Sequence, residues 1–226
     1  MKSRFISIEG IDGSGKSTLI TALKSYLEQH SQPVIVVREP GSTSLGEAVR
    51  SWVKNASDTA PTPDAELLLF FAARYQLVAE RIKPALEQGY WVLADRYLDS
   101  SFAYQVYATG ASPKLYQALI DPLKHILPDL TLLIDLPPAL QTQRASQTQL
   151  FADIEANADP QAALIDAFDN RSIEFFNKVQ DGFRHLAQTE AHRINTLCGS
   201  LQPDEIARQA ITLLQRLMEP NTATKQ

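Results

Sequence analysis

The stretch Gly10-Ile11-Asp12-Gly13-Ser14-Gly15-Lys16-Ser17 decides the fold of this chain. It fits the phosphate-binding pattern G-x-x-x-x-G-K-[ST] at every fixed position. The apolar run Phe5 to Ile8 comes directly before it and a helical pattern follows, which predicts a strand, a glycine-rich loop and a helix in succession. Such a loop forms a concave nest of backbone N–H groups at the positive end of a helix dipole.

The loop predicts a site for a nucleoside triphosphate and a magnesium ion. Lys16 can reach the β- and γ-phosphates as a point charge, and the Ser17 hydroxyl suits magnesium. The alternative is a glycine-rich turn between a strand and a helix that binds no ligand. This alternative does not explain why every fixed position of the motif is matched and why a strand and a helix flank it. The predicted triphosphate-binding residues are Gly10, Ile11, Asp12, Gly13, Ser14, Gly15, Lys16, Ser17 and Thr18.

Five short apolar runs alternate with helical patterns along the chain. They are Phe5 to Ile8, Val34 to Val37, Trp91 to Ala94, Leu130 to Ile134 and Arg193 to Leu197. This alternation predicts an α/β fold in which helices cover a parallel sheet. Ligands of such sheets bind at the carboxyl ends of the strands.

Prolines mark the ends of two predicted helices and interrupt one of them. Pro63 begins a long helical pattern that ends near Gly89, and Pro203 begins the last one. Pro84 falls inside the long pattern. We expect a kink or a break near Lys83, because proline removes a helix hydrogen bond and restricts the residue before it.

Length and composition exclude several classes of protein. A chain of 226 residues has room for one sizeable domain. Its net charge of −5 argues against a nucleic-acid or anionic-membrane surface. Cys198 is the single cysteine, so no internal disulfide can form. No apolar N-terminal segment resembles a signal peptide, and the apolar stretch Leu67 to Ala73 is far too short to cross a bilayer. We expect a cytoplasmic protein without membrane or nucleic-acid partners.

Two further strand ends carry charges that suit phosphate. Asp95 and Arg96 follow the third apolar run, where Asp95 could orient magnesium waters and Arg96 offers a fork of donors to phosphate oxygens. Pairing of these two charges with each other is the structural alternative. Arg38, at the end of the second run, adds another basic fork.

Two helical patterns carry groups suited to a nucleobase. Phe70 and Arg74 are four residues apart and share a helix face, where a ring and a guanidinium could hold a base. Phe70 could equally be a core residue. Ser101, Tyr104 and Gln105 have i, i+3, i+4 spacing, and the amide of Gln105 can pair with a pyrimidine edge.

Together these segments resemble the bacterial members of the thymidylate kinase family, which phosphorylates dTMP to dTDP with ATP. The resemblance runs from about Phe5 to Leu217. The segments that carry it are Glu9 to Ser17, Arg38-Glu39-Pro40-Gly41, Phe70 to Arg74, Asp95-Arg96-Tyr97, and Ser100 to Gln105.

This resemblance implies a P-loop kinase fold with a five-stranded parallel sheet, usually a homodimer. It implies one nucleoside-monophosphate kinase domain over residues 1–219, with a lid near 144–171 and a flexible tail at 220–226. Phe70 would stack on thymine, Arg74 would bind its carbonyl edge, and Ser101 and Gln105 would complete base recognition. Tyr104 would crowd the 2′ position of the sugar, Asp12 would engage the 3′-hydroxyl, and Arg96 and Arg38 would hold the dTMP phosphate, with Arg50 as a further candidate.

The lid departs from the family pattern. Where relatives carry Asp-Arg-x-Glu, this chain reads Asp166-Ala167-Phe168-Asp169, and residues 145–170 contain no lysine or arginine. Our hypothesis is that Arg144 or Arg171 supplies the missing transition-state charge beside Lys16 and Arg96. A surface ion pair of Arg171 with Asp169 or Glu174 is the alternative.

Three other functions compete with this interpretation. Another P-loop nucleoside or nucleoside-monophosphate kinase would share the phosphate loop and differ in the residues that read the base. A GTPase would need an Asn-Lys-x-Asp element, and Asn177-Lys178-Val179-Gln180-Asp181 misses that spacing by one residue. A nucleotide-binding module without catalysis is the third possibility.

Overall fold

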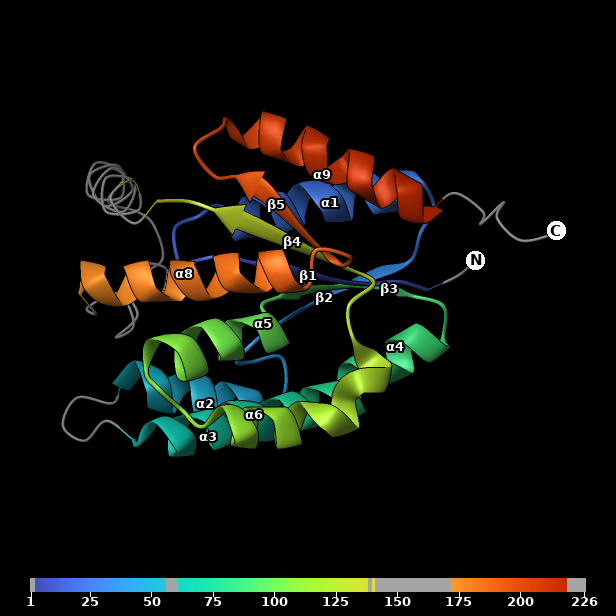
Figure 1. Ribbon diagram of the computed structural model, residues 1–226. Coiled ribbons are helices and arrows are strands. Elements are labelled where there is room, and N and C mark those ends of the chain that lie inside the picture. Colours follow the sequence, from blue (N-terminus) through green and yellow to red (C-terminus); the bar gives the residue numbers. More distant parts are fainter. Residues whose placement is uncertain (1–2, 56–60, 138–139, 141–171, 219–226) are drawn as a thin grey trace, which may run out of the picture.

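The computed structural model describes residues 3–55, 61–137, 140 and 172–218. Five strands form one parallel sheet in the order β2-β3-β1-β4-β5 (Figure 1). The strands are β1 Phe5–Glu9, β2 Val34–Arg38, β3 Trp91–Asp95, β4 Leu130–Asp135 and β5 Ile194–Cys198. The predicted α/β fold with a five-stranded parallel sheet is therefore confirmed. The predicted lid and tail, with Arg144 and Arg171, lie outside the described residues.

Helices connect the strands and cover both faces of the sheet. The α-helices are α1 Lys16–Gln29, α2 Ser44–Asn55, α3 Pro63–Leu77, α4 Lys83–Glu87, α5 Leu98–Ser101, α6 Pro113–Ile120, α8 Ile173–Thr189 and α9 Pro203–Met218. Two π-helical segments, η1 Val78–Ile82 and η2 Phe102–Ala108, and the 3₁₀ segment η3 Asp121–Ile126 complete the described helices. In Figure 1, α1 and α9 lie on one face of the sheet, and α3, α4, α6 and α8 lie on the other.

Side chains that alternate along a strand pack into hydrophobic cores on opposite faces of the sheet. In β1, Ile6 and Ile8 pack with Leu23 of α1 and Leu214 of α9. Phe5 of the same strand belongs to the opposite core, with Phe71 of α3. Successive strand side chains point to opposite faces, so a strand covered on both sides is apolar throughout. That requirement explains the mainly apolar sequences of the central strands β1, β3 and β4.

The long helix interrupted by Pro84 changes its winding instead of breaking. The backbone N–H of Lys83 bonds to the carbonyl of Val78, five residues back, and closes the π-helical segment η1. Pro84 then lies in the first turn of α4, where a helix does not need the N–H group that proline lacks. Of the expected kink or break near Lys83, the break is wrong, because the chain continues through a π-helical turn.

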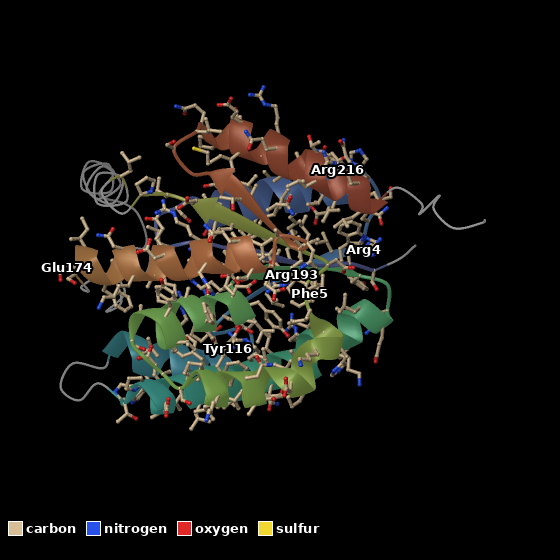
Figure 2. The ribbon with its side chains drawn as sticks, in the orientation of Figure 1. Arg4, Phe5, Tyr116, Glu174, Arg193 and Arg216 are labelled. Carbon is tan, nitrogen blue, oxygen red and sulfur yellow. The ribbon has the colours of Figure 1, made fainter. Side chains whose placement is uncertain are left out.

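The two ends of the described chain meet at the edge of the sheet where the strands begin. Arg4 donates to the carbonyl oxygen of Leu217 at 3.2 Å and to Asp129 at 3.0 Å. Figure 2 accordingly labels Arg4 and Arg216 at the same end of the molecule. Within the described residues, no helix is long and apolar enough to cross a membrane.

A buried ion pair joins β5 to α5 beneath the sheet. Arg193 donates to both carboxylate oxygens of Asp99, at 2.8 and 2.7 Å, and to the Thr131 hydroxyl at 3.1 Å. Asp99 is only 1 % exposed. Figure 2 labels Arg193 between the sheet and the layer of α6, close to Phe5 and Tyr116.

Replacing Arg193 by alanine should lower the free energy of unfolding by about 3 kcal/mol, because it leaves the buried Asp99 carboxylate without its partner. Urea denaturation measures this change. The control is Arg184→Ala, which removes a 47 % exposed partner of Asp135 and should cost less than about 1 kcal/mol. Equal losses in the two variants would contradict the importance of the buried pair.

Candidate active site

A pocket of about 440 Å³ opens at the carboxyl ends of the strands. Its walls come from the loop after β1, the turn after β2, helices α2 and α3, and the segment from β3 to η2. Most residues predicted from the sequence line it, namely Asp12, Gly13, Gly15, Lys16, Ser17, Thr18, Arg38, Arg50, Phe70, Asp95, Arg96, Tyr104 and Gln105. Gly10, Ile11, Ser14, Arg74 and Ser101 are not among the lining residues. The volume suits a small-molecule ligand.

The phosphate loop has the backbone that its glycines predict. Gly10 has a φ of 141°, and a Cβ atom there would lie 2.7 Å from the carbonyl oxygen of Ile134. Gly15 caps α1 in a left-handed conformation with a φ of 102°. These two positions therefore exclude other residues, the first by close approach and the second by conformation.

Lys16 is anchored across its own loop. Its Nζ donates to the carbonyl oxygens of Gly10 at 3.2 Å and Ile11 at 3.0 Å, and lies 3.5 Å from the Asp12 carboxylate. Burial and the nearby Arg96 charge lower the pKa of Lys16, while Asp12 opposes the change. The ammonium is thus held at the loop by backbone oxygens.

Arg96 and Asp12 form the ion pair at the centre of the pocket. Arg96 Nη2 contacts Asp12 Oδ1 at 2.5 Å, and Nη1 donates to the Gly10 carbonyl at 2.9 Å and to the Ser100 hydroxyl at 3.2 Å. Burial alone would raise the pKa of Asp12, but Arg96 and Lys16 outweigh it and lower that pKa well below its usual range. Asp95 does not pair with Arg96 in this arrangement, so the predicted structural alternative is wrong.

Asp95 and Ser17 are suitable ligands for magnesium. Asp95 Oδ1 is buried, and no hydrogen-bond partner for it exists among the residues described here. The described part of the chain contains no group of three or more His, Cys, Asp or Glu side chains suited to a metal. A site of this kind fits magnesium, which keeps several waters and takes further ligands from phosphates.

Arg38 reaches the pocket from the turn after β2 and is held by a carboxylate. Its Nη2 donates to both oxygens of Glu47, at 3.1 and 3.0 Å. Gly41, beside this pair, has a φ of 145°, a conformation that favours glycine. The Arg38 side chain is 50 % exposed and lines the pocket.

Arg74 is buried beside the pocket and is not among the residues that line it. It is 1 % exposed and is bound by the Glu39 carboxylate, the Ser101 hydroxyl at 2.9 Å and the Tyr97 carbonyl at 3.0 Å. Apart from the position of Glu39, no sequence pattern indicated the Arg74–Glu39 pair. Glu39 follows Arg38, and adjacent residues at a strand end point to opposite sides.

The segment η2, which carries Tyr104 and Gln105 on the pocket wall, is π-helical. In a π-helix a different set of residues shares one face than in an α-helix. The i, i+3, i+4 spacing of an α-helix puts Ser101 with Tyr104 and Gln105. In η2 the hydrogen bonds run from i to i+5, so each turn holds more residues. Ser100 therefore lines the pocket with Tyr104 and Gln105, and Ser101 binds Arg74. Ser100, Glu39, Pro40 and Val53 are lining residues that the sequence analysis did not select.

Glu9 at the end of β1 holds the turn that carries Arg96. It is fully buried and accepts hydrogen bonds from the Tyr97 backbone N–H at 2.7 Å and from the Ser100 hydroxyl. Burial and the neighbouring Asp99 charge raise the pKa of Glu9 from 4.5 to about 7, against the opposing effects of Ser100 and Arg96.

A phosphate loop that opens on an aromatic and amide-lined pocket defines the class of P-loop kinases. Comparison with known proteins identifies the family. The model of the family described as thymidylate kinase matches residues 8–211. The chain belongs to the thymidylate kinase family.

Relatives of known name agree over nearly the whole chain. The thymidylate kinase of Carboxydothermus hydrogenoformans is 38 % identical over 91 % of this chain and 94 % of its own. That of a Marinomonas species is 38 % identical over 97 % of both chains. The crystal structure of thymidylate kinase from Ehrlichia chaffeensis superposes with a TM-score of 0.72 at 31 % identity, covering 95 % of this chain and 100 % of that one.

Replacing Glu9 by glutamine should remove a pH-dependent part of the stability. The folded state binds the Glu9 proton more tightly than the unfolded chain, whose pKa is near 4.5. The unmodified chain should therefore lose roughly 1–3 kcal/mol of unfolding free energy relative to Glu9→Gln as the pH rises from about 5 to about 8. Urea unfolding across that range measures the difference. Glu28→Gln on the exposed face of α1 is the control. If the unfolding free energies of the unmodified chain and Glu9→Gln change in parallel with pH, the raised pKa of Glu9 is refuted.

Proposed function

We propose that this pocket carries out the reaction of the thymidylate kinase family, transfer of the γ-phosphoryl group from ATP to dTMP, giving ADP and dTDP. One observation supports this most directly: the phosphate loop, two arginines and a base-sized wall of Phe70, Tyr104 and Gln105 line one continuous cavity. Two phosphorylated ligands can therefore meet end to end in it. We also propose one kinase domain over residues 1–219.

The donor side consists of the phosphate loop and α1. The loop amides and Lys16 would bind the β- and γ-phosphates of ATP. Magnesium, held by the Ser17 hydroxyl and through water by Asp95, would neutralise phosphate charge there. This assignment is supported by the buried Asp95 oxygen that lacks a protein partner among the described residues.

The acceptor side consists of the turns after β2 and β3 with α3 and η2. Arg96 and Arg38 would bind the dTMP phosphate, and Asp12 the 3′-hydroxyl. Phe70 would stack on thymine, Tyr104 would lie against the sugar, and Gln105 would bind the base edge. Four of the five N–H donors of Arg74 have acceptors; for the second on Nη1 no acceptor is found within the described residues, and we assign it to a base carbonyl.

The chemical step needs positioning more than proton transfer, because the attacking dTMP phosphate oxygen is already anionic. Lys16 and Arg96 would spread the charge that develops on the moving phosphoryl group. We further propose a cytoplasmic homodimer. The exposed apolar side chains Leu45, Trp52 and Leu68 on the adjacent helices α2 and α3 support an association surface.

A panel of acceptors tests this function. With ATP and magnesium, ADP release should be fast with dTMP, slower with dUMP, and weak with dCMP, AMP and thymidine. Lys16→Ala should lower the turnover with dTMP by roughly a hundredfold, because it removes charge from the transferred phosphoryl group. Lys24→Ala, on the solvent side of α1, should leave turnover unchanged. Activity with AMP or thymidine alone would indicate another nucleotide kinase, and binding without turnover would indicate a nucleotide-binding module.

The sequence hypothesis about the lid leads to a separate prediction. Arg144→Ala or Arg171→Ala should lower the turnover with dTMP more than tenfold, equivalent to about 1.4 kcal/mol of activation free energy. Steady-state kinetics of the two variants measures this. Arg208→Ala on the exposed face of α9 is the control. If both lid variants retain turnover within that limit, another group supplies the charge.

A further inference from the structure

A buried carboxylate lies behind the amide that faces the base. Glu66 of α3 is 6 % exposed, and Gln105 of η2 is 1 % exposed. Gln105 Nε2 donates to Glu66 Oε1 at 2.9 Å. Gln105 lines the pocket and Glu66 does not. The pair therefore links a pocket residue to a group one layer behind it.

The chemistry of this pair fixes which end of the Gln105 amide faces Glu66. An ionised carboxylate only accepts hydrogen bonds, whereas an amide has a donor end and an acceptor end. The NH₂ end must therefore meet Glu66, and the carbonyl end is turned away from it. Gln105 Oε1 is buried, with no hydrogen-bond partner found among the described residues. A buried acceptor of this kind requires a donor, and a ligand in the pocket can supply one.

We propose that Glu66 is a positioning residue that makes the base site selective for a pyrimidine with a protonated N3. Thymine and uracil present N3–H, a donor that the fixed Gln105 carbonyl accepts. Cytosine presents an N3 lone pair, which the same carbonyl repels. This inference rests on the proposed function, because it assumes that the base of the acceptor nucleotide lies against Gln105.

A second glutamine–glutamate pair of the chain provides a matched control. Gln76 Nε2 donates to Glu80 Oε1, but this pair lies on the exposed side of the helix and neither residue lines the pocket. Glu80→Gln makes the same chemical change as Glu66→Gln, but at a pair that lies outside the pocket. It should leave the kinetic constants for every nucleotide unchanged.

The test compares kcat and KM for dTMP and dCMP in the unmodified chain, Glu66→Gln and Glu80→Gln. Glutamine has the shape of glutamate but can donate as well as accept, so the Gln105 amide is free to turn its NH₂ group to the pocket. In Glu66→Gln we expect KM for dTMP to rise about tenfold with kcat nearly constant, and the preference for dTMP over dCMP in kcat/KM to narrow about tenfold or more.

A double variant separates positioning from folding. Glu66→Gln combined with Gln105→Glu keeps the same atoms and net charge, and again leaves an acceptor oxygen at position 105. It should restore the preference for dTMP to within about fivefold of that of the unmodified chain. Thermal melting identifies which variants are folded.

The outcomes distinguish the two proposals. If the unmodified chain prefers dTMP but the folded Glu66→Gln keeps both its KM and its preference, the inference about Glu66 is wrong and the proposed function stands. A folded double variant that behaves like Glu66→Gln would also overturn the inference. If the unmodified chain phosphorylates dCMP as well as dTMP, the proposed base site itself fails.

Discussion

The contacts of Arg96 join the two strand ends on which the pocket depends. Its backbone N–H bonds to Ile8 of β1 at 3.0 Å, and its φ of 71° turns the chain sharply after β3. Its guanidinium then contacts the Gly10 carbonyl, Asp12 and Ser100, and lies 5.1 Å from the centre of the Tyr104 ring. One side chain thus couples the phosphate loop to the turn after β3 and to η2. These contacts hold the three segments that form the pocket in one arrangement relative to each other.

In this acidic protein, three arginines in or beside the pocket are each paired with a carboxylate. Arg38 is held by Glu47, Arg96 by Asp12, and the buried Arg74 by Glu39. These carboxylates offset the cost of placing cations close together in a partly desolvated site. They also fix each guanidinium in one orientation before a phosphate arrives, which is the preorganisation that phosphoryl transfer requires.

The sequence predicted those parts of the molecule that local chemistry determines. The central strands β1, β3 and β4 were recognisable because burial on both faces makes them mainly apolar, and the phosphate loop because Gly10 and Lys16 occupy fixed positions. The Glu39–Arg74 and Glu66–Gln105 pairs are tertiary contacts between distant segments, and no local spacing predicts them. The sequence analysis selected Ser101 and not Ser100, whereas Ser100 lines the pocket and Ser101 binds Arg74 just before the π-helical segment. The role of Ser101 in base recognition stays a prediction.

The π-helical turn of η2 also determines how this wall of the site can change in length. A π turn is in effect an α-helix with one additional residue. Deleting a single residue between Phe102 and Ala108 would convert the segment to ordinary α winding while the helix on either side keeps its place. Only the side chains within the turn, Tyr104 and Gln105 among them, would be redistributed around the helix. Insertions and deletions are tolerated in the loops of most enzymes. In this helix, adding or removing one residue would change which side chains face the base.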